Sequence, residues 1–413
     1  MRFSLLVFIA LFFPVFLRAQ VSGCDGTRYK KDVFTAIKKT TISYAPTTTV
    51  LGENIQLAMD VYEPDNDAAA KRPVVVLAHG GSFYAGDRTM MERYCRLLAQ
   101  KGYVAATIQY RLYPLFVLGF PDSSAIFDTA VKAIGDMKAA VRYFRMDAAT
   151  DNRFRIDPDH VFAGGYSAGA VTALNTGFID PQDSLPPFIA QLVAKNGGLE
   201  GNSGNPANKS QSSAVEAVIN MSGGMYRRNW IDADDVPVAS IHGTADLTVP
   251  YTKGLSANIA YLEGSSLLHA RALEVGVRST LETVTGGGHT NIYDLPLYST
   301  QLDAFWAQAT ALLESLSCAT TAVTDPRLAE TNWHFTPNPL QSNRALTLHL
   351  PETHVAASVS FHLFDVSGKE VFLAKNMTEG QMVYMPRLPS GNYFAHLRDA
   401  QGTRFIVKTL LMP

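Results

Sequence analysis

A serine flanked by two glycines is the first candidate for chemistry, at residues 165–169, which read Gly-Tyr-Ser-Ala-Gly. The pattern alone is weak: with glycine at 30 of 413 residues, and serine similarly common, about one chain in six of this length would contain it by chance. Its setting is more specific, because the apolar run 161–163 precedes it and a helical pattern at 168–176 follows. A sharp turn between a strand and a helix predicts a strained, exposed nucleophile at Ser167, whereas a plain Gly/Ser turn would carry no chemistry.

A base must take the proton from the serine hydroxyl, and an acid must orient that base. At turns of this kind the chain order is serine, then an acid, then histidine. His289 follows a predicted strand at 281–285 through three glycines, at the sheet edge where α/β folds carry functional side chains. His269 lies in the middle of a helical pattern, where packing or solvation is the usual role. We therefore predict that His289 is the base.

The predicted acid is Asp246, which lies on a loop just past the predicted strand 236–241. Asp234 and Asp235 precede that strand, at the opposite edge of the sheet, and are predicted to be solvated loop charges. His242 lies before the acid in the chain, which is the wrong order for the base. We predict that it hydrogen-bonds backbone groups at the strand end.

An oxyanion needs preorganised N–H donors. Residues 79–83, His-Gly-Gly-Ser-Phe, follow the apolar strand pattern 74–78 directly, where an oxyanion loop is expected. We predict that the backbone N–H groups of Gly81 and Ser82, with that of Ala168 after the nucleophile, form the oxyanion hole. His79 is predicted to be structural.

The elements that must position these residues follow an α/β pattern between residues 25 and 318. Unbroken apolar runs at 72–78 and 103–108 are typical of strands buried on both faces of a parallel sheet. Apolar residues at spacings of three and four over 127–146 predict a long amphipathic helix. Shorter strand patterns recur at 161–163, 217–219, 236–241 and 281–285. Strands and helices in alternation predict a mostly parallel sheet flanked by helices.

A stretch rich in glycine, asparagine and serine interrupts this pattern at 180–213. We predict a long loop insertion that is functional or mobile rather than part of the core.

The five motifs together resemble one family. They are His-Gly-Gly at 79–81, Tyr-Arg-Leu-Tyr-Pro at 110–114, the serine pentapeptide at 165–169, Asp246 and His289. In this order they resemble an α/β-hydrolase of the carboxylesterase and hormone-sensitive-lipase-like kind. The resemblance implies an eight-stranded, mostly parallel sheet, a Ser-Asp-His triad and no cofactor. Ser82 departs from it, because these esterases usually have a third glycine there, which leaves the exact oxyanion donors open.

The composition and the residue pattern change after Cys318. Residues 319–336, rich in Thr, Ala and Pro, are predicted to be a linker. Residues 337–413 show short alternating runs broken by turn signals, which predict a small all-β, Ig-like sandwich. The motifs at 337–339, 363–369 and 388–393 resemble the C-terminal sorting domain of the type IX secretion system of Bacteroidetes, with an ordinary Ig-like adhesion module as the alternative. The resemblance implies secretion machinery as a partner, with export to the cell surface or beyond.

The N-terminus independently indicates export. A positive start, an apolar run at 3–17 and a small-residue site near Ala19 predict a signal peptide at 1–19, followed by the catalytic domain at 20–318. The run is too short to span a bilayer, so no transmembrane segment is expected in the mature chain. In an oxidising compartment the three cysteines are disulfide candidates. We predict a Cys24–Cys318 bridge and a buried, free Cys95, although the sequence alone allows two other pairings.

Composition excludes several classes of protein. Hydrophobic residues make up 47% and charged residues 17% of the chain, which is globular rather than disordered. The net charge of −2 leaves no broad basic surface for nucleic acid. His349 and His354 lack the accompanying ligands that a metal site needs, so no metal is expected.

These observations predict a secreted serine carboxylic-ester hydrolase that acts on small-molecule or polysaccharide-linked esters, such as acetyl or feruloyl groups of plant polysaccharide. A lipase or a serine peptidase on the same fold, and a catalytically inactive surface-binding protein, are the alternatives.

Overall fold

The computed structural model describes residues 24–294, 296–318, 334–336, 345–349, 359–365, 370–378, 380–385, 388–389, 391–398 and 404–412. Two compact units divide the chain, one up to Ala319 and the other from Thr320. The predicted signal peptide at 1–19 lies outside the described residues, as does most of the predicted linker. That linker was predicted to run to residue 336, which is wrong at its end, because strand β12 already begins at His334.

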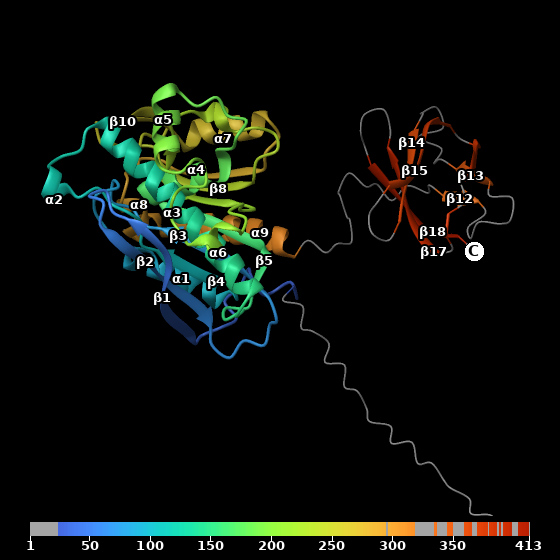
Figure 1. The fold of residues 1–413 in the computed structure, drawn as a ribbon, viewed down its shortest axis with the longest axis horizontal. Coiled ribbons are helices and arrows are strands. Elements are labelled where there is room, and N and C mark those ends of the chain that lie inside the picture. Colours follow the sequence, from blue (N-terminus) through green and yellow to red (C-terminus); the bar gives the residue numbers. More distant parts are fainter. Residues whose placement is uncertain are drawn as a thin grey trace, which may run out of the picture. The chain divides into compact units, whose positions relative to one another are not determined.

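An eight-stranded sheet forms the centre of the first unit (Figure 1). Its spatial order is β1 (Ile37–Thr48), β2 (Asn54–Pro64), β4 (Val104–Ile108), β3 (Arg72–Ala78), β5 (Ile156–Tyr166), β6 (Val218–Met221), β8 (Val238–Gly243) and β11 (Ser279–Val284). The pairs from β4 to β11 are parallel, whereas β1 and β2 are antiparallel to their neighbours. The predicted eight-stranded, mostly parallel sheet is confirmed.

Helices cover both faces of this sheet, as predicted from the unbroken apolar runs. In β3, Val74 and Val76 join the core under α3 and α4, whereas Val75 and Leu77 join the core under α1 and α9. The helical segments are η1 (Arg88–Met91), α1 (Glu92–Gln100), α2 (Leu115–Leu118), α3 (Ser123–Ala149), α4 (Ala168–Phe178), α5 (Pro187–Lys195), α6 (Pro206–Lys209), η2 (Arg228–Trp230), α7 (Ser265–Glu274), α8 (Asn291–Asp294), η3 (Pro296–Tyr298) and α9 (Ser299–Ser317). A small antiparallel sheet of β7 (Gly224–Met225), β10 (Ala260–Gly264) and β9 (Lys253–Ser256) was not predicted.

The insertion at 180–213 is not the loose loop that its composition predicted. It contains α5 and α6, and its polar residues are used inside the protein. Arg142 of α3 donates to Asn208 Oδ1 at 3.0 Å and to the carbonyl oxygen of Ser203 at 3.1 Å. A Cβ on Gly201 would lie 2.5 Å from the Cα of Gly135, so the two backbones are in direct contact. The prediction failed because the polar residues of the insertion form hydrogen bonds with buried polar groups of α3.

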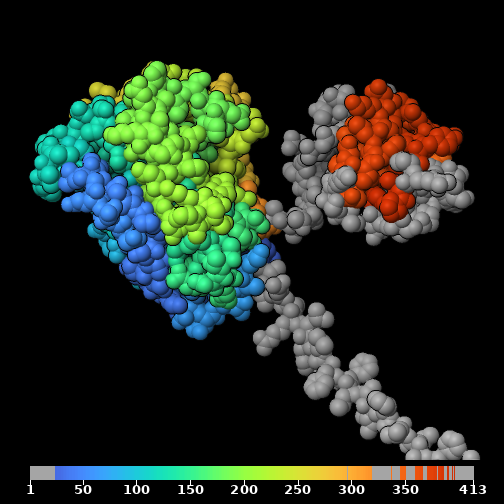
Figure 2. Space-filling view, viewed as in Figure 1, coloured from blue at the N-terminus to red at the C-terminus, as the bar shows by residue number. Residues whose placement is uncertain are grey.

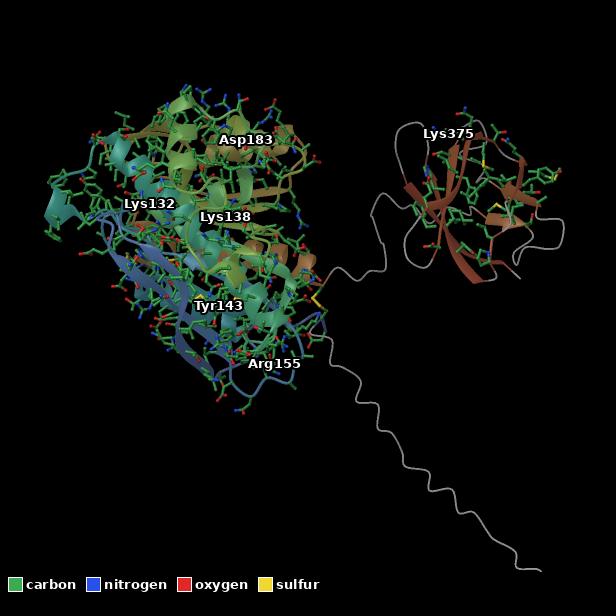
Figure 3. The ribbon with its side chains drawn as sticks, viewed as in Figure 1. Lys132, Lys138, Tyr143, Arg155, Asp183 and Lys375 are labelled. Atoms are coloured by element: carbon green, nitrogen blue, oxygen red, sulfur yellow. A yellow bond between two sulfur atoms is a disulfide. The ribbon has the colours of Figure 1, made fainter. Side chains whose placement is uncertain are left out.

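Figure 2 shows the surface of this insertion, in light green, beside the blue surface of β1 and β2. A hydrogen bond from the Gly204 N–H to the Pro46 carbonyl oxygen, at 3.0 Å, joins them. Lys132 and Lys138 mark α3, the helix that the insertion covers (Figure 3).

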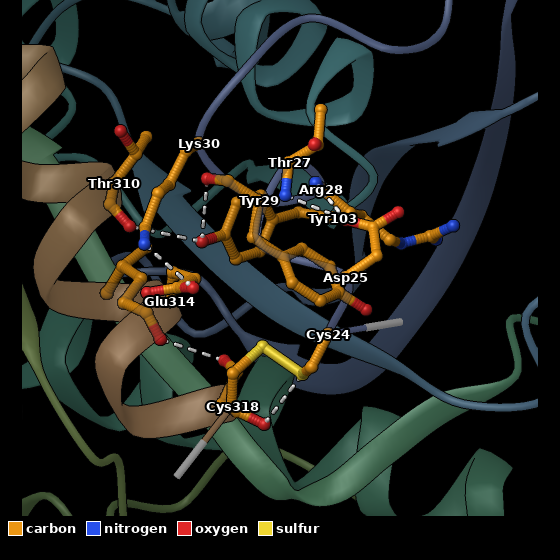
Figure 4. The surroundings of a disulfide bond; sticks show 12 residues. Cys24, Asp25, Thr27, Arg28, Tyr29, Lys30, Tyr103, Thr310, Glu314 and Cys318 are labelled. Carbon is orange, nitrogen blue, oxygen red and sulfur yellow. Dashed lines mark hydrogen bonds and ion pairs between the residues drawn. A yellow bond between two sulfur atoms is a disulfide. The ribbon is translucent and has the colours of Figure 1, made fainter. Parts of the chain in front are cut away.

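A disulfide between Cys24 and Cys318 joins the two ends of the first unit, with 5.5 Å between the Cα atoms (Figure 4). Close by, Lys30 forms an ion pair of 3.0 Å with Glu314 of α9. Cys95 is a free, buried thiol on α1. The predicted pairing is therefore confirmed.

The second unit is all-β, as predicted. Its strands form an antiparallel sheet of β12 (His334–Thr336), β13 (Ala345–His349) and β16 (Met382–Tyr384), and another of β15 (Glu370–Met377), β14 (Val359–Phe364), β17 (Gly391–Arg398) and β18 (Arg404–Met412). No helix among the residues described in either unit is long and apolar enough to cross a membrane.

Candidate active site

Ser167 lies at the sharp turn between β5 and α4, with φ at 56° and ψ at −121°. The two neighbouring glycines are required there. A Cβ on Gly169 would lie 2.0 Å from the carbonyl oxygen of Ala78, and one on Gly165 would lie 2.4 Å from the carbonyl group of Gly169. The strained turn was predicted, but the predicted exposure was wrong, since Ser167 is only 5% exposed. The reason is that the turn faces cavities rather than open surface.

The structure brings the three predicted triad residues together. The Ser167 hydroxyl lies 2.8 Å from His289 Nε2, and His289 Nδ1 lies 2.6 Å from Asp246 Oδ2. His269, the rejected candidate, instead contacts Ser279 Oγ from α7. A path of hydrogen bonds therefore runs from a strained serine to a buried carboxylate.

Glycines bring the loops of Asp246 and His289 into contact. A Cβ on Gly243 would lie 2.2 Å from the carbonyl oxygen of Gly287. The Ala245 N–H donates to that same oxygen at 2.9 Å, and the Gly286 N–H donates to Thr244 Oγ1 at 2.9 Å. The glycine run before His289 thus fixes the distance between the Asp246 and His289 loops.

Asp246 is held as a carboxylate by four donors. Its Oδ1 accepts from the N–H groups of Thr248 and Val249 at 2.8 and 2.9 Å, and its Oδ2 lies near both His289 and His242. Burial raises the pKa of Asp246, but the hydrogen bonds from His242 and His289 outweigh burial and hold this pKa well below its usual range. The acid is therefore ionised throughout the neutral range.

His242 was only partly understood from the sequence. It contacts a backbone group, the carbonyl oxygen of Val249 at 3.0 Å, as predicted. It also lies 3.2 Å from Asp246 Oδ2, which the chain order gave no reason to expect. The spacing of the two residues, four positions apart across a strand end, was the signal that could have indicated this contact.

Tyr166 packs against His289 and hydrogen-bonds to its backbone. Its ring stacks on the His289 ring with 5.3 Å between centroids, and its hydroxyl donates to the carbonyl oxygen of His289 at 3.2 Å. Burial raises the pKa of Tyr166 well above its usual range, so the phenol stays neutral. Sequence reasoning did not identify this residue, although it lies inside the serine pentapeptide.

The predicted oxyanion residues lie around Ser167. Gly81 and Ser82 line the cleft that contains Ser167 and His289, and Ala168 lines the adjoining cavity. A Cβ on Gly80 would lie 3.1 Å from the Cβ of Ser167, so this loop passes directly over the serine. Gly81 and Ser82 have φ values of 118° and 53°. Within the described part of the chain, the backbone N–H groups of Gly81, Ser82 and Ala168 make no hydrogen bond.

His79 is buried at the start of this loop and does not contact the triad. Its ring stacks on Tyr110 with 4.3 Å between centroids, and Tyr110 donates its hydroxyl to the His79 carbonyl oxygen at 2.8 Å. This position agrees with the structural role that the sequence predicted.

Two cavities of different character meet at Ser167. A mostly apolar cavity of about 60 Å³ is lined by Phe83, Phe127 and Val171 among others. A wider cleft of about 510 Å³ is lined by polar as well as apolar groups, including Arg93 and Asp294. A substrate could thus place an apolar part and a polar part on either side of the nucleophile.

A third cavity extends the apolar one. It measures about 70 Å³, shares Phe127, Val171 and Leu262 with it, and is lined by Ile189 of the insertion and by Lys138. Burial lowers the pKa of Lys138, which also lies near Glu200. The insertion therefore contributes one wall of this third cavity. In the described ranges, no group of three or more His, Cys, Asp or Glu residues is arranged to hold a metal ion.

The stability of the domain is expected to depend on the protonation of Asp235. It was predicted to be a solvated charge, which holds for the exposed Asp234, but Asp235 is partly buried. Burial, with Asp183 (Figure 3) and other aspartates nearby, raises its pKa to about 7, whereas Asp183 itself is raised to about 6. A carboxyl whose folded pKa is raised destabilises the fold above that pKa, and this penalty disappears as the pH falls toward the unfolded value of 3.8.

Asp235→Asn should therefore raise the Tm at pH 8 by about 2–4 °C and have little effect near pH 4. The asparagine keeps the oxygen that accepts from the Asp232 N–H. Thermal melts over this pH range, with Asp234→Asn as the exposed control, measure the effect. A gain in Tm that is the same at pH 8 and pH 4 would contradict it.

Two family models match the chain. Residues 59–227 match the BD-FAE family, and residues 335–411 match the family described as a secretion system C-terminal sorting domain. The second match begins within β12 and covers the all-β unit almost to its end.

Curated relatives match over shorter stretches. The chain is 32% identical over 120 residues to para-nitrobenzyl esterase of Bacillus subtilis, which is 28% of this chain and 23% of that protein. It is 27% identical over 126 residues to Esterase-5A of Drosophila persimilis, which is 30% of this chain and 22% of that protein. The matched stretch thus spans less than a quarter of either relative.

Solved structures include a thermophilic esterase from Thermogutta terrifontis with propionate bound, which is 20% identical with a TM-score of 0.47 and covers 66% of this chain and 93% of that one. The same esterase with butyrate bound gives 20% identity and a TM-score of 0.47, covering 70% of this chain and 96% of that one.

The sorting domain marks the chain for export to the cell surface or outside the cell. In the first unit, the BD-FAE match covers residues 59–227. This range contains part of the eight-stranded sheet and the turn that carries Ser167. The chain therefore combines an α/β unit whose residues 59–227 match the BD-FAE family with an all-β unit whose residues 335–411 match the secretion system C-terminal sorting domain.

Proposed function

We propose that the chain hydrolyses carboxylic esters through an acyl-enzyme on Ser167. The observation that carries this proposal is the hydrogen-bonded path from Ser167 through His289 to the buried carboxylate of Asp246, at a strained turn that opens into two cavities. No other described histidine contacts a serine at such a turn.

The chemistry follows from this geometry. As Ser167 Oγ bonds to the ester carbonyl carbon, its proton passes to His289 Nε2, and Asp246 stabilises the imidazolium that forms. The backbone N–H groups of Gly81, Ser82 and Ala168 hold the oxyanion. When the carbon–oxygen bond to the alcohol breaks, His289 returns the proton to the leaving oxygen. Water, deprotonated by His289, then attacks the acyl carbon, and His289 returns this proton to Ser167 Oγ as the bond to the acyl group breaks and the acid is released.

The two cavities favour a small or flat acyl group and a large polar alcohol. The cavity of about 60 Å³ is lined mainly by apolar side chains and suits an acyl group. The open cleft of about 510 Å³ carries Arg93, Tyr94 and Asp294, which can hydrogen-bond a polyhydroxylated alcohol. We therefore propose short acyl or aromatic esters of plant polysaccharide, such as acetyl or feruloyl groups, as substrates.

One observation favours a second candidate, a lipase. Residues 115–120 form an apolar loop that projects from the domain around α2 (Figure 1). Phe116 and Phe120 are 101% and 85% exposed. The loop begins next to the cavity, because the Tyr113 N–H donates to the carbonyl oxygen of Phe83 at 2.7 Å. Exposed apolar runs of this kind are uncommon without a function, and contact with a lipid surface is one such function.

An ester panel separates the two candidates. We expect kcat/KM to be at least about tenfold higher for p-nitrophenyl acetate and methyl ferulate than for p-nitrophenyl palmitate, because a palmitoyl chain exceeds the apolar cavity and its extension, of about 60 and 70 Å³. Acetylated xylan should release acetate. A preference for palmitate that is lost in Phe116→Ser/Phe120→Ser, and retained when the distant exposed Val33 is changed to serine, would show the lipase instead.

A further inference from the structure

A buried row of polar side chains lies behind Asp246, outside the triad. Asn220 comes from β6, Ser240 and His242 come from β8, and Ser265 is the first residue of α7. Each is at most 3% exposed. Buried polar groups cost free energy unless they are paired, so the way in which their hydrogen bonds are directed is informative.

The amide of Asn220 fixes the direction of the row. The Gly223 N–H donates to Asn220 Oδ1 at 2.9 Å, which identifies that atom as the oxygen. Asn220 Nδ2 therefore faces Ser240 Oγ at 3.0 Å and Ser265 Oγ at 2.9 Å. An amide nitrogen only donates, so Ser265 accepts a hydrogen bond from Asn220.

Ser265 in turn has one proton to give. Its hydroxyl oxygen lies 2.7 Å from His242 Nδ1 and 3.4 Å from the carbonyl oxygen of Gly223. The shorter contact lies in the normal range for a hydroxyl donor and the longer one does not. Ser265 thus donates to His242 Nδ1, which leaves the proton of the neutral ring on Nε2.

His242 Nε2–H points at the catalytic acid. It lies 3.0 Å from the carbonyl oxygen of Val249 and 3.2 Å from Asp246 Oδ2, the same oxygen that faces His289 Nδ1. Without this fixed tautomer, a bare ring nitrogen would face both a carbonyl oxygen and a carboxylate, which is repulsive. The row therefore ends in a donor that is aimed at the oxygen on which the base depends.

We propose that His242 is a positioning residue for Asp246, with its tautomer set by Ser265 and Asn220. The inference deepens the proposed function and rests on it, because it assigns His242 a role in the same reaction. His242 does not line either cavity at Ser167. It holds the Asp246 carboxylate in the plane of His289. Its hydrogen bond to Oδ2 also draws on the charge of that oxygen and so limits how strongly the carboxylate stabilises the His289 imidazolium.

The surroundings of Asp246 leave few other groups to act in this way. His289 and His242 are the titratable side chains within hydrogen-bond range of its carboxylate. Tyr166 and Tyr293 lie further away, and burial keeps both phenols neutral by raising their pKa values well above the usual range. A change in the pH profile of the reaction is therefore a direct readout of the His242 contact.

Two substitutions of similar size separate positioning from packing. In His242→Gln the amide nitrogen can reach the place of Nε2 and keep the donor to Asp246, whereas in His242→Asn it reaches only the place of Nδ1. With p-nitrophenyl acetate between pH 5 and 9, we expect His242→Asn to lower kcat about tenfold with KM nearly unchanged, because the Asp246 carboxylate is no longer held in the plane of His289. The acid limb of its kcat/KM profile should move up by about half a pH unit, since Asp246 then stabilises the imidazolium more strongly. His242→Gln should restore most of kcat and the profile.

Ser265→Ala covers the case in which His242→Asn does not fold. It removes only the hydroxyl that sets the tautomer, and it should lower kcat several-fold with KM unchanged. His269→Asn, the same substitution at a histidine elsewhere on α7 whose Nδ1 contacts Ser279 Oγ, is the matched control and should leave kcat unchanged. Equal losses in His242→Asn and His242→Gln, or a loss of kcat with no change in the pH profile, would overturn the proposal.

Failure of the proposed function would look different. A fluorophosphonate probe would then not label Ser167 in the wild-type chain at all, whereas the positioning proposal concerns only the rate and pH profile of a chain that is labelled.

Discussion

Replacing Ser167 by alanine is expected to lower kcat for p-nitrophenyl acetate by about 10⁶-fold. The loss is large because this one oxygen forms the bond to the acyl carbon, and His289 and Asp246 have no other nucleophile to activate. Ser167 contacts His289 Nε2 at 2.8 Å through its hydroxyl, while its backbone N–H donates to the Met221 carbonyl oxygen. Alanine keeps the backbone bond and loses only the hydroxyl, so the fold and the Tm should change little.

The measurement compares initial rates, circular dichroism and fluorophosphonate labelling for the wild type and Ser167→Ala. Ser124→Ala is the matched control, since Ser124 is an exposed residue of α3 that lines neither cavity at Ser167 and should keep both activity and labelling. Residual hydrolysis near the wild-type rate in Ser167→Ala would rule out the acyl-enzyme mechanism, whatever the geometry of the three residues.

Much of the catalytic domain could be predicted because its strands are buried on both faces. Such strands appear in the sequence as unbroken apolar runs, and β3, β4, β6 and β8 all lie where those runs lie. The edge strand β1 and its neighbour β2 were missed, since their polar residues alternate with apolar ones over a long hairpin. The short strands β7, β9 and β10 were missed because they contain too few residues to show a period.

The insertion shows where composition misleads. Glycine, asparagine and serine usually indicate a loop, but here they provide close backbone contacts and buried hydrogen bonds to α3. The partners of these residues, Arg142 and the carbonyl oxygen of Ala139, are far away in the sequence. Only the fold brings them together, so no local pattern could have predicted the packed state.

In the candidate site, too, some residues could be predicted from the sequence and others could not. Ser167, Asp246 and His289 follow strand ends in a fixed order, so the chain order and the position after a predicted strand were sufficient to predict them. The contacts of Tyr166, His242 and Ser265 depend on ring orientation and on hydrogen bonds between elements that are separate in the sequence. These supporting residues could be identified only from the structure.

The disulfide provides the second large effect. Cys24 and Cys318 are separated by 294 residues, so their bridge closes almost the whole catalytic domain into one loop. Closing a long loop lowers the conformational entropy of the unfolded chain. Cys24→Ser/Cys318→Ser should therefore lower the free energy of unfolding by about 2–5 kcal/mol. The activity of the folded enzyme should be retained, because Arg28 still pairs with buried Asp67 at 2.9 Å and holds the N-terminal segment.

A reductant distinguishes this effect from ordinary packing. Guanidinium unfolding of the wild-type chain should shift to a lower midpoint when dithiothreitol reduces the bridge, whereas the double variant should show the same midpoint with and without it. Cys95→Ala is the control: Cys95 is a buried free thiol whose pKa is raised by burial, so its variant loses packing but keeps the dithiothreitol response. A wild-type midpoint that is insensitive to full reduction would contradict a stabilising role. If Cys95→Ala no longer responds to dithiothreitol, Cys95 takes part in the stabilising bridge, against the Cys24–Cys318 pairing. The two variants together therefore test both the pairing and its effect on the free energy of unfolding.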